Sequence, residues 1–72
     1  MIKNQIGNNV GIVWRTLNAS NRKMSINELG SITLLTEIEI SIAIGWLARE
    51  GQVVIIEESG IMYFSTYYEM FY

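Results

Sequence analysis

Few side chains in this chain could carry out acid–base or nucleophilic chemistry. The 72 residues include no His and no Cys, and all seven acidic residues are Glu, which excludes imidazole or thiolate catalysis, disulfides and the common zinc sites. Glu37 and Glu39 lie two positions apart on an expected helix, so they point about 200° apart and cannot form a carboxylate pair. Glu57 and Glu58 are adjacent in an expected turn and are most simply solvated. With no Gly-rich phosphate loop or nucleophile motif, we expect no enzymatic activity, metal or cofactor.

The composition favours a protein partner over nucleic acid. Five basic residues against seven acidic ones give a net charge of −2, whereas nucleic-acid-binding domains usually carry a basic patch. Half of the residues are hydrophobic, which is a large share for a chain with so little interior. The simplest explanation is that apolar surface is buried against another chain, so we expect a homodimer, with a different protein as the second choice. The alternative is that abundant Ile reflects genome composition.

The sequence lacks the marks of a membrane or secreted protein. No segment approaches the ~20 consecutive apolar residues that cross a bilayer. The first nine residues carry one charge and have no apolar core or small-residue cleavage site, which argues against a signal peptide. Because no Cys requires an oxidising compartment, we expect a cytoplasmic protein.

A long helix with two apolar faces is predicted at about 37–50. Thr36 and Glu39 form the S/T-x-x-E capping box that begins it. Gly51 occupies the position of a left-handed C-terminal cap. One face at helical spacing consists of Ile40, Ala43, Ile44 and Leu47, and a roughly opposite face consists of Ile38, Ile42 and Trp46. One face is enough to seat the helix on a small core, so the second predicts a further contact.

Two more helices precede it. The first is expected at about 5–18, because apolar residues recur there at helical spacing: Ile6, Val10, Val13, Trp14 and Leu17. Gly7 and Gly11 lie beside this stripe and each costs up to ~1 kcal/mol of helix propensity, so we interpret them as sites of close backbone approach. A capping box from Ser25 to Glu28 opens a short helix at about 26–31. Its expected buried positions, with one Leu of the following turn, are Ile26, Leu29, Ile32, and Leu34 or Leu35.

The last third of the chain predicts a β-hairpin. Strands are expected at about 53–57 and 61–65, where β-branched and aromatic residues dominate, and Gly60 can supply positive φ in the turn between them. The aromatic tail, residues 66–72, either extends the second strand or packs as an arm.

The order of these elements is helix, short helix, turn, long helix and hairpin, which is that of a winged helix-turn-helix domain. We therefore expect an α+β, mainly α, fold in a single domain spanning residues 1–72. In this fold the third helix is the usual recognition element and the hairpin is the wing. The alternative is a three-helix domain with an unrelated hairpin, but two capping boxes at suitable separation favour the winged helix.

Two sequence patterns support this interpretation. The first helix carries Ile6-Gly7, Asn9, Gly11 and Val13-Trp14, and the third ends in Gly45-Trp46-Leu47-Ala48-Arg49-Glu50. Together they resemble a family of small, largely uncharacterised bacterial winged helix-turn-helix proteins, over roughly Ile6 to Ile56. The resemblance implies a predicted DNA-binding domain and a homodimer, and it brings no catalytic or ligand-binding residues.

DNA binding by an autonomous transcriptional regulator is the alternative function. The third helix opens with Glu37, Ile38 and Glu39, which supply carboxylates and apolar groups where base readout needs basic or amide side chains. The wing tip, Glu57-Glu58, is also acidic. The residues available for DNA contact are Arg15, Arg22, Lys23, Ser41 and Arg49.

The favoured function is a non-enzymatic, homodimeric protein-interaction module, with transcription control as its expected setting. The candidate interface residues are Ile38, Ile42, Trp46, Tyr68 and Phe71. Two alternatives stay open: this face packs on the protein's own wing or first helix, or Trp14 and Trp46 pack together inside.

Overall fold

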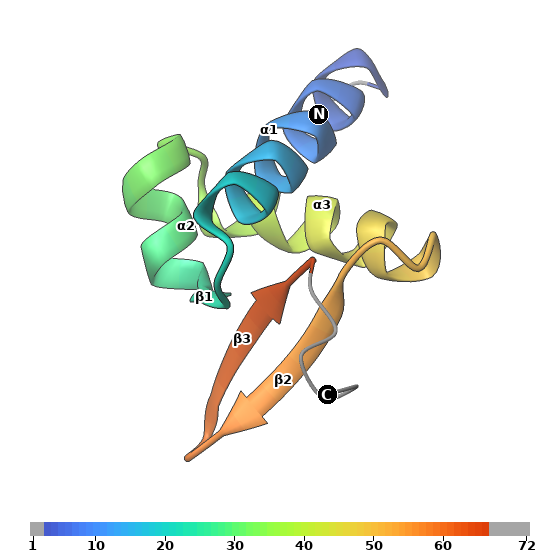
Figure 1. The fold of residues 1–72 in the computed structure, drawn as a ribbon. Helices are drawn as coiled ribbons and strands as arrows, with labels where there is room; N and C mark the ends of the chain where they lie inside the picture. The colour runs from blue at the N-terminus through green and yellow to red at the C-terminus, as the bar shows by residue number, and fades with distance from the viewer. Residues whose placement is uncertain (1–2, 67–72) are drawn as a thin grey trace.

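Three helices followed by a hairpin confirm the predicted winged helix-turn-helix arrangement (Figure 1). The structure is a computed structural model that describes the backbone of residues 3–66 and the side chains of residues 5–66. Its elements are α1 (Lys3–Ser20), β1 (Met24–Ser25), α2 (Ile26–Thr33), α3 (Glu37–Arg49), β2 (Val54–Glu58) and β3 (Ile61–Ser65).

Both capping boxes form as predicted. The backbone N–H of Glu28 donates to Ser25 Oγ over 3.2 Å, and the Ser25 N–H donates to Glu28 Oε1 over 2.9 Å. At α3 the same reciprocal pair joins Thr36 and Glu39, at 3.1 and 2.9 Å. Each box satisfies amides that a helix start leaves without intrahelical partners, which explains why the sequence located these two starts correctly.

The helix ends are less well predicted than the starts. α1 is longer than 5–18 at both ends, so Asn18 to Ser20 are helical rather than loop. α2 continues past residue 31 because the Leu34 N–H donates to the Gly30 carbonyl over 2.9 Å, with Leu34 in the left-handed region at φ 63°. α3 ends at Arg49 rather than residue 50, and Gly51 adopts the predicted positive φ of 72°.

A three-stranded antiparallel sheet forms the wing, in the order β1-β3-β2. The β2–β3 turn places Ser59 and Gly60 at φ 54° and 80°, which is the geometry that joins twisted strands most tightly. β2 begins one residue later than predicted. Strand β1 was not predicted, because its two residues, pairing Met24 with Phe64, are too short for any periodic signal.

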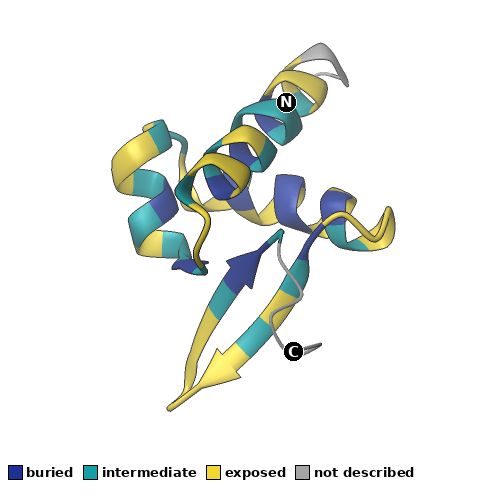
Figure 2. Cartoon of the chain, in the orientation of Figure 1, coloured by how far each residue is buried: buried dark blue, intermediate teal, exposed yellow. Residues whose placement is uncertain are grey.

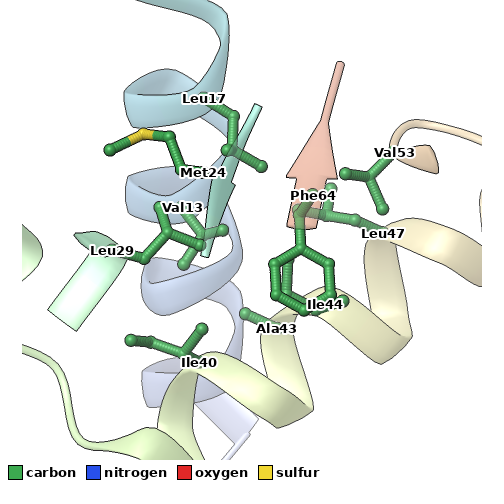
Figure 3. Close-up of a cluster of buried hydrophobic side chains, with 10 residues drawn as sticks. All are labelled: Val13, Leu17, Met24, Leu29, Ile40, Ala43, Ile44, Leu47, Val53 and Phe64. Atoms are coloured by element: carbon green, nitrogen blue, oxygen red, sulfur yellow. The ribbon is translucent and has the colours of Figure 1, made fainter. Parts of the chain in front are cut away.

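The core lies where α1, α3 and β3 meet, as Figures 2 and 3 show. The predicted inner face of α3 is buried in full. The core side chains are Val13, Leu17, Met24, Leu29, Ile40, Ala43, Ile44, Leu47, Val53 and Phe64. A single cluster of this size is what one small domain can enclose.

Three residues expected at helix contacts or in the core lie elsewhere. Ile32 is exposed, so its assignment to the core is wrong; of the two turn leucines, Leu35 packs against the core and Leu34 is exposed. The close-approach interpretation of the α1 glycines is also wrong. A Cβ added at Gly7 would meet nothing within 4 Å, and one at Gly11 would meet the Arg15 side chain of the same helix.

Truncating a side chain on each face of α3 should change the free energy of unfolding by different amounts. Ile40→Ala should lower the free energy of unfolding by about 2–5 kcal/mol, because it empties a fully buried site. Ile38→Ala should change it by less than about 0.5 kcal/mol, because that side chain is exposed in the single chain. Urea denaturation measures both at protein dilutions where the unfolding midpoint no longer changes with concentration, so that the free energy is that of the monomer. Equal losses would contradict the assignment of faces.

Candidate functional site

The outward face of α3 carries large apolar side chains. Ile38, Ile42 and Trp46 are 71%, 39% and 54% exposed, and none belongs to the core cluster. The alternatives in which this face completes a two-sided core, or in which Trp46 is internal, therefore do not describe the chain. Trp14 does pack against the core from α1. What remains is an apolar stripe at i, i+4 and i+8 on the helix that normally meets the ligand of a winged helix.

Trp46 connects this stripe to a groove on α1. The groove has a volume of about 460 Å³ and is lined by Ile6, Gly7, Val10 and Trp46. The N-terminal end of α1 extends past the crossing with α3 in Figure 1. The α3 stripe and this groove thus share Trp46 and together comprise Ile38, Ile42, Trp46, Ile6, Gly7 and Val10.

Small residues and segregated charges accompany the stripe. Ser41 is exposed and Gly45 has open space beside its Cα, so the backbone of α3 is accessible between the large side chains. The first turn of α3 contains Glu37 and Glu39, and the last turn contains Arg49. The helix is thus acidic at one end and basic at the other, a distribution that also suits its dipole.

The basic loop before α2 is engaged in ion pairs within the chain. Arg22 Nη1 lies 3.2 Å from Glu28 Oε2. Lys23 Nζ lies 2.6 Å from Glu58 Oε1 at the wing and 5.2 Å from the centre of the Tyr63 ring. Each candidate phosphate contact therefore sits beside a carboxylate, which weakens its attraction for DNA.

The other DNA candidates lie on α1 and α3. Arg15 lines a shallow groove that also includes Ile32 and Ser20. Ser20 Oγ donates to the Arg22 carbonyl over 3.2 Å, so this groove reaches the basic loop. Ser41 and Arg49 lie on α3, at its middle and its C-terminal end. The five candidates are thus distributed over three segments of the chain. Tyr68 and Phe71, the other predicted interface residues, lie outside the described part of the chain.

Among residues 3–66 there is no group of three or more His, Cys, Asp or Glu side chains placed to hold a metal ion. Within the same range no single helix has the length and apolarity to cross a membrane; only α2 and α3 taken together, bent by 110°, reach that length and composition.

Comparisons with known proteins place the fold in a family. A family model described as winged helix-turn-helix domain (DUF2582) matches residues 1–66. The chain belongs to this family. No curated protein matches the sequence. The resemblance inferred from the sequence patterns, to small bacterial winged helix-turn-helix proteins, is thereby confirmed.

A solved structure supports the DUF2582 assignment. The solution NMR structure of protein BT2368 from Bacteroides thetaiotaomicron is 38% identical to this chain, with a TM-score of 0.80. The similarity covers 90% of this chain and 78% of that one. The family and the fold indicate a module that binds DNA or protein.

Of the α1 residues that carry the family resemblance, some are buried and others lie at the surface. Val13 is fully buried, and Asn9 is buried with an Nδ2 that has no hydrogen-bond partner among the described residues. Gly7, by contrast, opens the groove beside Trp46. Sequence analysis placed Ile6 and Val10 in one continuous helical stripe with Val13 and Leu17 and so did not separate the groove from the core contact. No signal of length was available, because the two helices were predicted to be equally long, whereas α1 has 18 residues and α3 has 13, a difference of about 7.5 Å.

The ion pair at the α2 cap predicts a pH dependence. The Ser25 N–H, assisted by the Arg22 guanidinium, holds the pKa of Glu28 below its ordinary 4.5, against the opposing effect of desolvation. The charged cap therefore contributes stability above pH 4.5 that is lost as the pH falls through the lowered pKa. Glu28→Gln should flatten this part of the stability profile, as measured by thermal unfolding between pH 3 and pH 6. A Glu28 titration midpoint above 4.5, by carboxyl NMR, would contradict the assignment.

Proposed function

We propose that this DUF2582 protein is a non-enzymatic binding module that self-associates through α3 and acts by protein contacts. The observation that carries the proposal is the exposure of Ile38, Ile42 and Trp46 on the recognition helix. Contiguous exposed apolar side chains on a small domain mark an interaction site. Transcription control in the cytoplasm is the setting that fold analogy suggests.

The energetics of the stripe suit association. Each Ile contributes about 1.5–3 kcal/mol when it is fully buried, before the costs of association are subtracted. A symmetric contact would bury two Ile side chains and a Trp from each of two copies, and the free energies of burial of these side chains would add up. Trp is enriched among the residues that dominate protein interfaces. A second copy is the simplest partner, because a self-complementary surface needs no other gene product.

Charge favours this function over DNA binding. DNA binding depends on several Lys or Arg contacts with phosphates. The exposed start of α3 holds Glu37 and Glu39 instead, and Lys23 lies in an ion pair with Glu58 of the wing. The recognition helix would bring carboxylates to a polyanion, so the autonomous DNA regulator is the weaker candidate.

Ile42→Glu tests the association directly. The substitution places two carboxylates near each other in any symmetric contact centred on α3, where both repulsion and desolvation oppose pairing. We expect light scattering to give twice the chain mass of 8.2 kDa for the native protein and 8.2 kDa for the variant. Circular dichroism should show an unchanged fold, because Ile42 lies outside the core.

Ile32→Glu is the matched control. Ile32 is another exposed Ile on a helix, but it faces the groove between α1 and α2. Its replacement should leave the dimer mass unchanged. A monomeric native protein, or an equal loss of association in both variants, would overturn the proposal.

A DNA titration tests the alternative. Fluorescence anisotropy of a mixed-sequence duplex at low salt should stay flat up to about 100 µM protein, the weak end of the ~10⁻⁴–10⁻⁶ M range that non-specific DNA binding has at physiological salt. A saturating, salt-sensitive rise that Arg22→Gln or Lys23→Gln abolishes would establish the DNA function instead.

A further inference from the structure

We propose that two copies pair through antiparallel α3 helices, with Ile38 of each copy inserted into the α1 groove of the other. This inference rests on the proposed self-association and adds its geometry. The contact would be isologous, with a two-fold axis at Ile42. The occupant of the groove lined by Ile6, Gly7, Val10 and Trp46 is thus a defined side chain of a second copy.

The spacing of the stripe is symmetric about Ile42. Ile38 and Trp46 lie four residues, or about 6 Å, on either side of it. An antiparallel pair therefore brings Ile38 of one copy opposite Trp46 of the other, and Ile42 opposite Ile42. Ser41 and Gly45 lie between the large side chains and allow the two backbones to approach.

Charge complementarity selects the antiparallel direction. The first turn of α3 carries Glu37 and Glu39, and its last turn carries Arg49. Antiparallel pairing places each Arg49 near the acidic turn of the other copy, whereas parallel pairing would place like charges together. At 100° per residue, Arg49 lies about 20° from Ile42 around the helix axis, Glu39 about 60° and Glu37 about 140°, so Arg49 and Glu39 carry this contact. Glu50 lies on the same side as Glu39, about 80° from Ile42, and further along the helix from the two-fold axis than Arg49.

The groove lies where the end of the second α3 would arrive. Trp46 is one of its walls, so a side chain opposite Trp46 meets Ile6 and Val10 as well. The first turn of α1 contains no acidic residue, and the positive end of its dipole would face the acidic turn of the second α3. The α3 stripe alone supplies three large side chains per copy, few for a stable interface of ~20 residues a side, and the groove extends it onto a second helix.

Cysteine cross-linking tests the geometry, because the native chain has no Cys. Gly7→Cys and Ile38→Cys are made in separate full-length chains, equilibrated as an equal mixture, and treated with a short bismaleimide. The three cross-linked products differ in mass and are separated by mass spectrometry. We expect the mixed Gly7→Cys/Ile38→Cys product to exceed the sum of the two homodimeric products, and so to exceed the 1:2:1 ratio of random collision.

The outcomes separate this proposal from the self-association it rests on. A dimeric native mass with predominance of the Ile38→Cys homodimer would overturn the antiparallel direction. A dimeric mass with the three products in the 1:2:1 ratio of random collision would overturn the groove contact, and self-association would stand. A monomeric native mass would overturn the proposed function as well.

Filling the groove gives a second test in which Ile38 is unchanged. A Cβ at Gly7 meets nothing within 4 Å, so Gly7→Leu should preserve the monomer fold while raising the dissociation constant at least about tenfold. Gly11→Leu is the matched control on the same helix, where the new side chain meets only the flexible end of Arg15. Unchanged association in Gly7→Leu, or equal weakening in both variants, would overturn the groove contact.

Discussion

The α3 helix has two apolar faces, and the fold can bury only one of them. A chain of this size encloses a single cluster, which Ile40, Ala43, Ile44 and Leu47 of α3 enter together with side chains of α1 and β3. The face that contains Ile38 and Ile42 is therefore left in solvent. The proposed function depends on this constraint, because the apolar stripe is covered by no part of the described chain and we propose that a second copy covers it.

The winged-helix fold presents its third helix for recognition, and the chemistry of that helix decides what it can recognise. In this chain the exposed positions of α3 combine carboxylates at the start with branched and aromatic side chains along the stripe. The basic loop before α2 is paired with Glu28 and Glu58. The fold that reads DNA in other proteins thus carries an apolar and acidic third helix in this chain, which supports the proposed protein contact.

Glycine has an unexpected role in α1. Gly7 does not permit close packing of another helix of the same chain; it leaves an opening between Ile6, Val10 and Trp46. Such an opening lowers helix propensity without improving the monomer core. The proposed insertion of a second copy would give this opening a function, and it would join the outer face of α3 to the N-terminal end of α1 in one surface.

Local patterns in the sequence determined the element order, both capped helix starts, the Gly51 cap and the two-faced character of α3, because capping boxes and helical periodicity act over a few residues. The tertiary structure alone decided that the second face of α3 is left exposed, that Ile32 is exposed, and that Met24 pairs with Phe64 in a short strand. These outcomes depend on where α1 ends relative to α3 and on which strand reaches the loop before α2. Such distances between elements are set by packing in three dimensions, and no local spacing of residues encodes them.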